Sequence, residues 1–322
     1  MDPLIRPIAA ELSRFEQRLD TALQANVALV HEISRYIATL RGKRLRPVLA
    51  LLSGQAVGGC NERTIEAAVA VELIHGATVV HDDVVDSATM RRGRASVNSA
   101  WTGQLAVLMG DFLLARALSI LVDLGELRAL RVISRATERL SVGEIFEIQI
   151  GQDGDTRLES YFSMVDDKTA SLIAAAARLG AILSGGTDAQ VEALGEYGEN
   201  VGRAFQIADD ILDFTSDAGT LGKPVGHDLE EGRITLPLIH ALDQAPAAER
   251  GALEALLRCG TRTPADGAAI ADFVARHQGV EAAKATARDC AARASQSLAV
   301  LPPSRARDSL VAAVNLVVER RY

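Results

Sequence analysis

Apolar residues recur along most of this chain with the 3.6-residue period of an amphipathic helix, not with the two-residue alternation of a strand. The first such segment, residues 8–23, places one apolar stripe along a single helix face: Ile8, Leu12, Phe15, Leu19 and Leu23. Further helical segments are predicted at residues 63–86, 103–124, 168–185 and 302–322. The segment at 103–124 is apolar on nearly all sides, which is typical of a helix at the centre of a bundle.

The pattern predicts an all-α fold with short connections. No alternating apolar and polar run with a hairpin turn is evident in the sequence. The breaks in the helical pattern are too short to be flexible linkers, and they fall at residues 57–61, 151–156, 185–188, 216–227, 260–267 and 302–304. We therefore predict one all-α domain over residues 1–322, an orthogonal and antiparallel bundle of roughly ten or more helices.

The composition agrees with a large helical core and argues against one function class. Of the 322 residues, 48% are hydrophobic and only 4% are aromatic, and the strong helix formers Ala and Leu are abundant. The formal net charge of -8 argues against binding of nucleic acid over a broad surface, because phosphate binding needs a basic field.

Neither the N-terminus nor the cysteines point to export or to a membrane. Residues 1–20 lack the basic-then-apolar order of a signal peptide, and no long apolar run is free of charge. Cys60, Cys259 and Cys290 do not have the spacing of a disulfide framework or a zinc site. We expect a soluble cytoplasmic protein without a transmembrane segment.

Two acid clusters of identical spacing are the first candidates for chemistry: "DDVVD" at residues 82–86 and "DDILD" at 209–213. On a helix the first and last aspartates of each cluster share a face, whereas the second lies about 100° away. Two carboxylates about 4 Å apart in a half-buried groove would repel by ~4 kcal/mol at an effective dielectric near 20. Bound Mg²⁺ would remove that repulsion, since it prefers carboxylate oxygens and shares its coordination shell with phosphates. Two such helices facing each other would form a multi-metal clamp for a diphosphate.

One acid cluster by itself is more often a solvated helix face, but two of equal spacing inside apolar sequence favour a binding site. Basic residues near the first cluster strengthen this interpretation. The segments "RGKRLRP" at 41–47 and "MRRGR" at 90–94 offer arginines for bidentate phosphate contacts, unless they form a surface ion-pair network. His75 precedes Asp82 by one to two helical turns, and it either faces the site or is a hydrogen-bonded core residue.

Taken in their order along the chain, these motifs resemble those of the trans-polyprenyl diphosphate synthases, the polyprenyl synthetase family. The matching pieces lie between residues 41 and 237 and are "GKRLRP", "ELIH", "HDDVVDSATMRRG", "GDFLLARA", "GE" at 143–144, "KTA", "FQIADDILDF" and "GKPVGHDLEEGRITLP". The resemblance is to the long-chain type, such as the octaprenyl diphosphate synthases.

The resemblance implies an isoprenoid synthase fold, in which helices surround a deep central cavity, and a homodimer. It implies a trans-prenyltransferase that uses Mg²⁺ to condense isopentenyl diphosphate repeatedly onto an allylic diphosphate, either farnesyl or geranylgeranyl diphosphate. An allylic cation forms as diphosphate departs, the double bond of isopentenyl diphosphate attacks it, and loss of a proton ends each step. In the family the released diphosphate is the base, which agrees with the lack of an obvious Ser/His or Glu/His pair. The product would be delivered to a membrane.

The resemblance also implies roles for individual residues. The residues that would hold Mg²⁺ are Asp82, Asp86 and Asp209, supported by Asp83, Asp210 and Asp213. Those that would contact the allylic substrate are Arg91, Lys168, Thr169, Gln206 and Lys223. Those that would bind isopentenyl diphosphate are Lys43, Arg46, His75 and Arg92. The catalytic set would be Asp82, Asp86, Lys168, Asp209 and Lys223.

Three positions depart from the family pattern. The family commonly has Gly where Arg41 stands, Lys where Arg233 stands, and Gln where Glu147 stands. None of the three removes a metal ligand. What the helical turn that carries Glu147 contributes to the site is left open.

Small residues before the first acid cluster predict a long product. Thr78 and Ala77 stand four and five positions before Asp82, where short-chain members of the family tend to carry aromatic side chains. The two residues between the aspartates of "DDVVD" also agree with long-chain members. We predict an all-trans product of about eight isoprene units (C40), which needs a shaft roughly 35–40 Å long at ~1.5 Å per helical residue. Phe112, Leu113 and Phe146 are candidates for its floor.

Three alternatives stay open. A metal phosphohydrolase of the HD type would use His81 and Asp82, but it leaves "DDILD" and "GKRLRP" unexplained. A non-catalytic subunit that pairs with an active synthase would be expected to have lost acids from one cluster, and both clusters are intact. A short-chain synthase that makes geranylgeranyl diphosphate would differ in product length alone.

Overall fold

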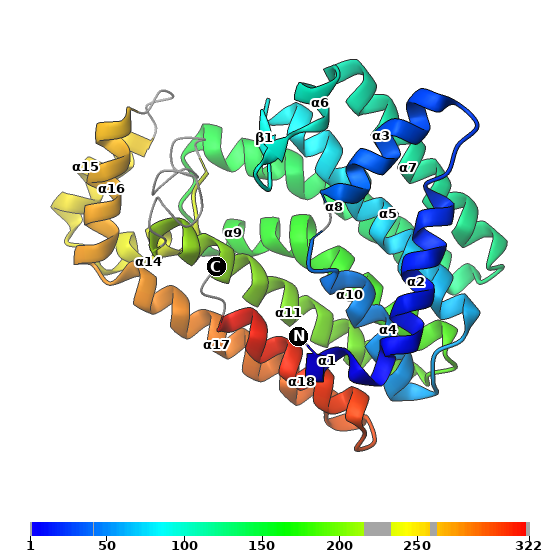
Figure 1. The fold of residues 1–322 in the computed structure, drawn as a ribbon. Coiled ribbons are helices and arrows are strands. Elements are labelled where there is room, and N and C mark those ends of the chain that lie inside the picture. Colours follow the sequence, from blue (N-terminus) through cyan, green and yellow to red (C-terminus); the bar gives the residue numbers. More distant parts are fainter. Residues whose placement is uncertain (1, 41, 216–232, 258–262, 320–322) are drawn as a thin grey trace. The chain divides into compact units, whose positions relative to one another are not determined.

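The computed structural model describes residues 2–40, 42–215, 233–257 and 263–319, and it is built almost entirely of helices (Figure 1). The all-α prediction is confirmed. Within the described part of the chain, the one departure is a hairpin of two-residue strands, β1 (Met90–Arg91) and β2 (Arg94–Ala95). The basic segment that follows the first acid cluster forms this hairpin.

The chain divides into two compact units, each assembled from segments distant in sequence. Unit 1 comprises Met1–Thr137, Leu172–Gly195 and Leu298–Leu310, and unit 2 comprises Glu138–Ser171, Glu196–Ser297 and Val311–Tyr322. Three helices contribute several residues to each unit: α8 (Leu127–Asp153), α11 (Asp188–Thr215) and α18 (Arg305–Val318), while α10 (Ser171–Leu183) has only its first residue in unit 2. The expectation of a single domain around a deep cavity stays a prediction.

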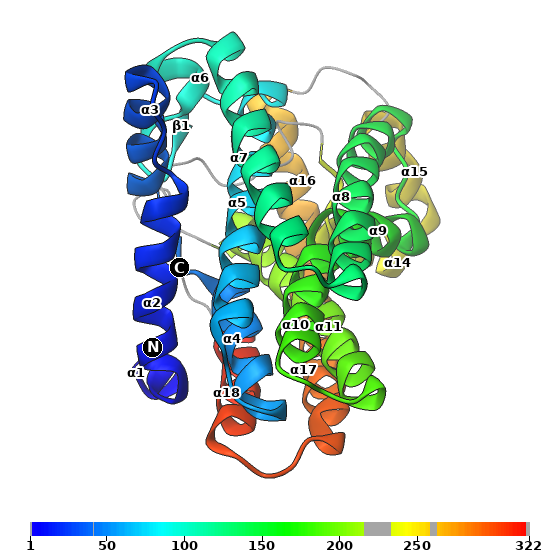
Figure 2. The same cartoon turned by 90° about the vertical axis from the view of Figure 1, so that its right-hand side faces the viewer.

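Unit 1 is organised around α5 (Glu62–Val85), which is buried along nearly its whole length. The helix can be buried on several sides because its sequence is apolar all round and rich in Ala. It packs against α2 (Ala9–Ala22), α4 (Leu45–Val57) and α7 (Gly103–Asp123), and Figure 2 shows α5 and α7 side by side. Besides the β1–β2 hairpin and its parts of α8, α11 and α18, the unit contains α1 (Asp2–Ile5), η1 (Arg6–Ile8), α3 (Ala28–Thr39), α6 (Val97–Ala100), all but the first residue of α10 (Ser171–Leu183), and η3 (Leu298–Val300).

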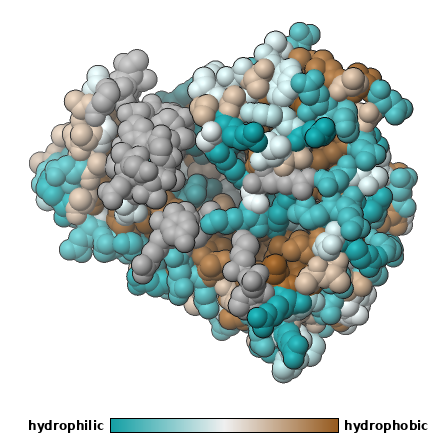
Figure 3. Space-filling view, viewed as in Figure 1, coloured by the Kyte–Doolittle hydropathy of each residue, from teal (hydrophilic) through white to brown (hydrophobic). Residues whose placement is uncertain are grey.

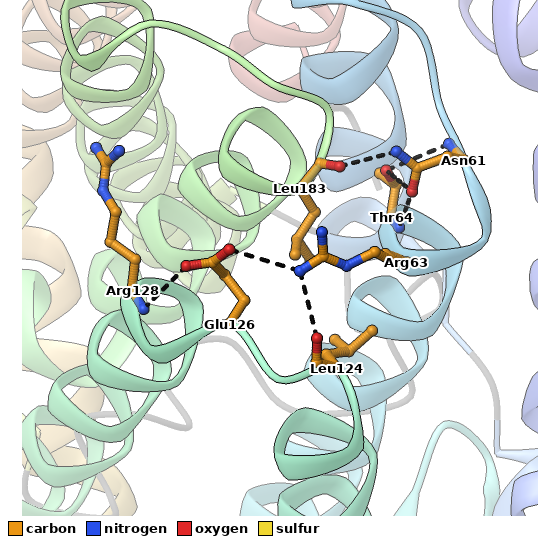
Figure 4. Close-up of polar contacts among 7 residues, drawn as sticks. All are labelled: Asn61, Arg63, Thr64, Leu124, Glu126, Arg128 and Leu183. Carbon is orange, nitrogen blue, oxygen red and sulfur yellow. Dashed lines mark hydrogen bonds and ion pairs between the residues drawn. The ribbon is translucent and has the colours of Figure 1, made fainter.

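The start of α5 is fixed by a capping box, drawn in Figure 4. The Asn61 side chain accepts from the Thr64 backbone N–H at 3.1 Å and donates to the Leu183 carbonyl at 2.8 Å. Arg63 donates to the Leu124 carbonyl and to Glu126, which ties α5 to the connection between α7 and α8. Such caps satisfy the backbone N–H groups that a helix start leaves unpaired. The acid cluster at the other end of α5 is therefore carried by an anchored helix.

Unit 2 contains, besides its parts of α8, α11 and α18, six elements: α9 (Leu158–Val165), η2 (Asp166–Ala170), α14 (Leu236–Gln244), α15 (Ala247–Leu257), α16 (Pro264–Arg276) and α17 (Gly279–Ser297). Helix α14 packs on α16 and α17, and α9 contacts both η2 and α14. The η2 segment is a π-helix, a wide turn with i→i+5 hydrogen bonds that is frequent at functional sites.

Apolar side chains remain exposed on one side of α7: Val107, Leu108, Leu118 and Val122, between 42% and 61% exposed. Length and composition alone would let α5 or α7 cross a membrane, although 61% of the most apolar stretch of α5 is buried. Only 33% of the corresponding stretch of α7 is buried. On the face drawn in Figure 3 hydrophilic residues predominate, and hydrophobic residues come to the surface in several separate places.

Candidate active site

The first acid cluster occupies the last turn of α5, in unit 1. Asp82 is half-buried and Asp86 is exposed, whereas Asp83 is only 1% exposed. This is the division that helical geometry predicts, with the first and last aspartates on one face and the second turned inward. Asp83 Oδ1 accepts from Arg91 Nε at 2.8 Å and from Arg91 Nη2 at 2.5 Å. The buried carboxylate is therefore neutralised by the β1 arginine, and the two accessible carboxylates are the ones offered to a cation.

The basic cluster of unit 1 lies near the first acid cluster. Arg46 Nη1 is 3.3 Å from His75 Nε2, and Arg44 is paired with Glu72. Burial lowers the pKa of His75 well below its ordinary value, assisted by the charges of Arg46, Arg92, Arg44 and Arg91. His75 is thus neutral near pH 7 while several arginines surround it.

Arg46 retains a hydrogen-bond donor without a partner. Its buried Nε atom has no acceptor among the described residues, and burial lowers the pKa of Arg46 to about 10, opposed by the charge of Glu72. A buried, unpaired donor on a cation is costly unless an anion accepts from it. The donor set fits a phosphate group. Lys43, predicted to act with Arg46, is exposed, and Arg92 donates to the Leu40 carbonyl.

The second acid cluster lies near the end of α11, in unit 2, and repeats the first one's arrangement. Asp209 is exposed and Asp213 half-buried, whereas Asp210 is 2% exposed. Asp210 Oδ2 accepts from the Tyr161 hydroxyl at 2.6 Å, and Asp210 Oδ1 accepts from Gln206 Nε2 at 3.0 Å. Burial raises the pKa of Asp210 to about 7, and these two hydrogen bonds oppose the shift.

Thr169 joins this network, because its hydroxyl donates to Gln206 Oε1 at 2.8 Å. A chain of hydrogen bonds therefore runs from Thr169 of η2 through Gln206 to Asp210 of α11, with Tyr161 of α9 at its end. Both Thr169 and Gln206 were predicted to contact an allylic substrate. Their bonds to each other fix their side chains in place in the free protein.

The π-helical turn that carries Lys168 and Thr169 is held on both sides within unit 2. From α8, Arg139 Nε donates to Asp167 Oδ1 at 2.5 Å. From α11, Arg203 makes a bidentate pair with Asp166, at 2.5 and 2.6 Å. The turn also packs directly on backbone: a Cβ added to Gly143 of α8 would lie 2.4 Å from the Lys168 backbone N, and one added to Gly202 of α11 would lie 2.4 Å from the Ala170 Cα. These contacts fix the turn in a wide conformation.

Lys168 itself is paired with two carboxylates of α8. Its Nζ lies 2.8 Å from Glu144 Oε2 and is also hydrogen-bonded to Glu147 Oε2. Burial alone would lower the pKa of Lys168, but the charges of Glu147 and Glu144 outweigh it, and the net shift is upward. Arg233 Nε stands 4.0 Å from Glu147 Oε2. A cavity of about 50 Å³ adjoins this group, lined among others by Glu147, Gln206, Asp209, Asp210 and Arg233.

The remaining predicted site residues fall in several places. Ala77 is 3% exposed, and half-buried Thr78 donates its hydroxyl to the His75 carbonyl at 2.9 Å. Lys223 and Arg41 lie outside the described residues. Across residues 2–40, 42–215, 233–257 and 263–319, no three His, Cys, Asp or Glu side chains come together as a ready-made metal site. The acids of each cluster alternate between accessible and inward-facing positions.

Sequence reasoning did not identify Tyr161, Arg139, Arg203 or Glu144 as parts of the site. For the two arginines a signal existed, because "DDKTA" places Asp166 and Asp167 on an otherwise apolar helix, and buried carboxylates need cationic partners. The sequence around Tyr161 gave no signal that its hydroxyl would donate a hydrogen bond to Asp210, 49 positions away.

Comparisons with known proteins agree with the resemblance found in the sequence motifs. The model of the polyprenyl synthetase family matches residues 27–274. The chain is 36% identical over 318 residues to the all-trans-nonaprenyl-diphosphate synthase (geranyl-diphosphate specific) of Rhodobacter capsulatus, covering 98% of this chain and 97% of that protein. It is 36% identical over 315 residues to the octaprenyl diphosphate synthase of Escherichia coli strain K12, covering 92% of each.

A solved structure extends the similarity to the whole fold. The crystal structure of a polyprenyl synthase from Caulobacter crescentus CB15, complexed with calcium and isoprenyl diphosphate, superposes with a TM-score of 0.92 at 34% identity. The superposition covers 100% of this chain and 98% of that one.

Proposed function

The chain belongs to the polyprenyl synthetase family and is a trans-prenyltransferase, and on that premise we propose a specific reaction for it. The enzyme condenses isopentenyl diphosphate repeatedly onto farnesyl or geranylgeranyl diphosphate and makes an all-trans product of about eight isoprene units. The observation that carries the proposal is the matched arrangement of the two acid clusters. In each one the first aspartate is accessible, while the second is buried and hydrogen-bonded by another residue.

We propose that Mg²⁺ is the cofactor and that Asp82, Asp86 and Asp209 hold it. Accessible carboxylates on one helix face are the oxygen donors that Mg²⁺ prefers. When bound, the cations would neutralise charge on the departing diphosphate. Asp83 and Asp210 are proposed to support the site indirectly, because the Asp83 carboxylate accepts hydrogen bonds from Arg91 and the Asp210 carboxylate accepts them from Tyr161 and Gln206. They orient the helix turns that carry the accessible aspartates.

The basic cluster of unit 1 is proposed to bind isopentenyl diphosphate. Arg46 offers its unpaired Nε donor, Arg92 adds positive charge near it, and Lys43 is proposed to act with them. His75 stays neutral beside these arginines, so it can donate one hydrogen bond to a phosphate oxygen without holding a permanent charge.

The allylic diphosphate is proposed to bind the group around η2. Lys168 supplies a buried positive charge, and Gln206 offers the second hydrogen of its amide, the first being donated to Asp210. Thr169 would donate to the diphosphate by turning its hydroxyl away from Gln206 Oε1. Arg91 and Lys223 complete the proposed set. Apolar residues beside the acids, such as Ile150 and Met164, exclude water that would otherwise quench an allylic cation.

Chain length is proposed to depend on Ala77 and Thr78, one turn before the first acid cluster. Both side chains are small, so they leave room for a growing apolar chain along α5.

A homodimer in the cytoplasm is proposed for the working state, with product passed on to a membrane. The apolar stripe on α7, formed by Val107, Leu108, Leu118 and Val122, supports a partner on that helix. A second copy of the chain would cover the stripe on both molecules through the same surface. Light scattering of the purified chain measures the mass directly.

The test of the function is incubation of the pure chain with Mg²⁺, farnesyl diphosphate and excess radiolabelled isopentenyl diphosphate, followed by sizing of the products. A ladder ending near eight units is expected, and chelation of the metal should abolish it. Products of four units would indicate a short-chain synthase, and no product at all would indicate a subunit that needs an active partner. Asp82→Asn and Asp209→Asn should each reduce the rate by at least about 10²-fold if both clusters act on the leaving group.

A further inference from the structure

Glu147 stands beside Lys168, and the structure gives its carboxylate a defined partner. Its carboxylate accepts from Lys168 Nζ, which also lies 2.8 Å from Glu144 Oε2. Glu144 and Glu147 stand three positions apart on α8, so they project from one helix face toward the same ammonium. Both carboxylates are only 17% exposed, and the Lys168 side chain is 20% exposed.

The two carboxylates beside Lys168 carry more negative charge than the single lysine carries positive charge, and this disfavours binding of an anion. Two carboxylates face one lysine, and the next cation, Arg233, reaches Glu147 only at 4.0 Å. An ammonium has three N–H donors, and Glu144 and Glu147 take two of them. A glutamine at position 147 would keep an acceptor oxygen for Lys168 but would bring no negative charge.

We propose that Glu147 is a specificity-determining residue that competes with the allylic diphosphate for Lys168. The inference rests on the proposed role of Lys168 in binding that diphosphate. For the diphosphate to pair fully with the Lys168 ammonium, the hydrogen bond between Lys168 and Glu147 must break. The Glu147 carboxylate then remains close to the bound anion and repels it. Both effects weaken binding of the allylic diphosphate.

The loss of the Glu147–Lys168 hydrogen bond is a cost of binding that is common to ground state and transition state, and uniform effects of this kind change KM. The repulsion between Glu147 and the diphosphate grows as negative charge develops on the departing group, so Glu147 also lowers kcat. Isopentenyl diphosphate, bound by the basic cluster of unit 1, should not sense the change.

The experiment compares Glu147→Gln with Glu138→Gln, a matched control on an exposed position of the same helix. For Glu147→Gln we expect KM for farnesyl diphosphate to fall by about five- to tenfold, with kcat equal to or above that of the wild type and KM for isopentenyl diphosphate unchanged. Glu138→Gln should leave all three constants as in the wild type. An unchanged or higher KM for farnesyl diphosphate in Glu147→Gln overturns the proposal.

A double-mutant cycle tests whether Glu147 acts through Lys168. In a Lys168→Gln background the further change Glu147→Gln should lower KM by clearly less than it does in the wild type, because the contested cation is gone and only the direct repulsion between Glu147 and the anion remains. The full five- to tenfold gain in that background would contradict competition for Lys168. Circular dichroism of each variant establishes that it is folded before its kinetics are compared.

Calorimetry with inorganic pyrophosphate and Mg²⁺ separates this inference from the proposed function. Glu147→Gln should bind pyrophosphate more tightly than the wild type and than Glu138→Gln, whether or not any prenyl product is made. Equal affinities overturn the competition between Glu147 and the anion. Tighter binding without polyprenyl products from the wild type would uphold the competition while refuting the proposed reaction.

Discussion

Gly143 offers a sharp test of the packing around the π-helical turn. A Cβ at this position would lie 2.4 Å from the Lys168 backbone N, 2.8 Å from the Lys168 Cα and 2.9 Å from the Asp167 carbonyl carbon. Cβ atoms essentially never approach other atoms within 3.0 Å, and all three neighbours are backbone atoms that no side-chain rotation can move. In Gly143→Ala, α8 and η2 must therefore separate by about 0.6 Å or more.

The separation has two consequences of calculable size. Overpacking of this kind costs ~1–3 kcal/mol in the free energy of unfolding. It also moves Lys168 relative to Glu144 and Glu147, which stand one and four positions beyond Gly143 on α8. Misplacement of a substrate-binding group by 1 Å can cost about 10²-fold in rate, so a shift of this size should lower kcat/KM for the allylic substrate by about tenfold or more.

Denaturant unfolding and steady-state kinetics measure the two effects. Gly251→Ala is the matched control, because Gly251 lies in α15 of the same unit and a Cβ there meets nothing within 4 Å. The control should gain about 0.5–1 kcal/mol of stability, the usual preference for Ala over Gly inside a helix, and keep full activity. A Gly143→Ala variant with wild-type stability and wild-type kinetics would show that α8 and η2 are not in direct backbone contact. It would also refute the claim that this contact positions Lys168.

Three further changes have expected outcomes of their own. Ala77→Phe should shorten the product to about three or four isoprene units, because an aromatic ring fills the space along α5, and unchanged chromatography of the products would refute this. Burial lowers the pKa of His75, so the folded state excludes a proton that the unfolded state binds below its ordinary pKa near 6.5. The wild type should lose up to about 1.4 kcal/mol of stability per pH unit below pH 6.5, and His75→Gln should lose less. Tyr161→Phe removes the donor 2.6 Å from buried Asp210 Oδ2 and should cost about 2 kcal/mol in urea unfolding, and a loss below 0.5 kcal/mol would mean that Asp210 does not need the phenol.

The helical framework was predictable from the sequence because its signals are local. The stripe from Ile8 to Leu23 became η1 and α2 with Ile8, Phe15, Leu19 and Leu23 buried, and the long apolar segments became α5 and α7. Helical geometry also separated the aspartates of each cluster correctly. Asp82 and Asp86 remain accessible while Asp83 turns inward, and the same order recurs at Asp209 and Asp210.

The expected lack of strands was wrong for the residues after the first cluster, which form the small β1–β2 hairpin. A two-residue strand is too short to produce an alternating pattern. The hairpin nevertheless matters to the site, because Arg91 of β1 neutralises Asp83.

The sequence by itself determined which residue types stand on which face of each helix, since a period of 3.6 residues needs no knowledge of neighbouring helices. Tertiary structure alone decided which side chains meet: Tyr161 with Asp210 across 49 positions, Lys168 with Glu147 across 21, and Gly143 against the π-helical turn. The pairing of buried charges depends on how closely two helices approach and at what register, and that is set by packing over the whole surface between them. A charge at a given position is therefore predictable from the sequence, but its partner is not.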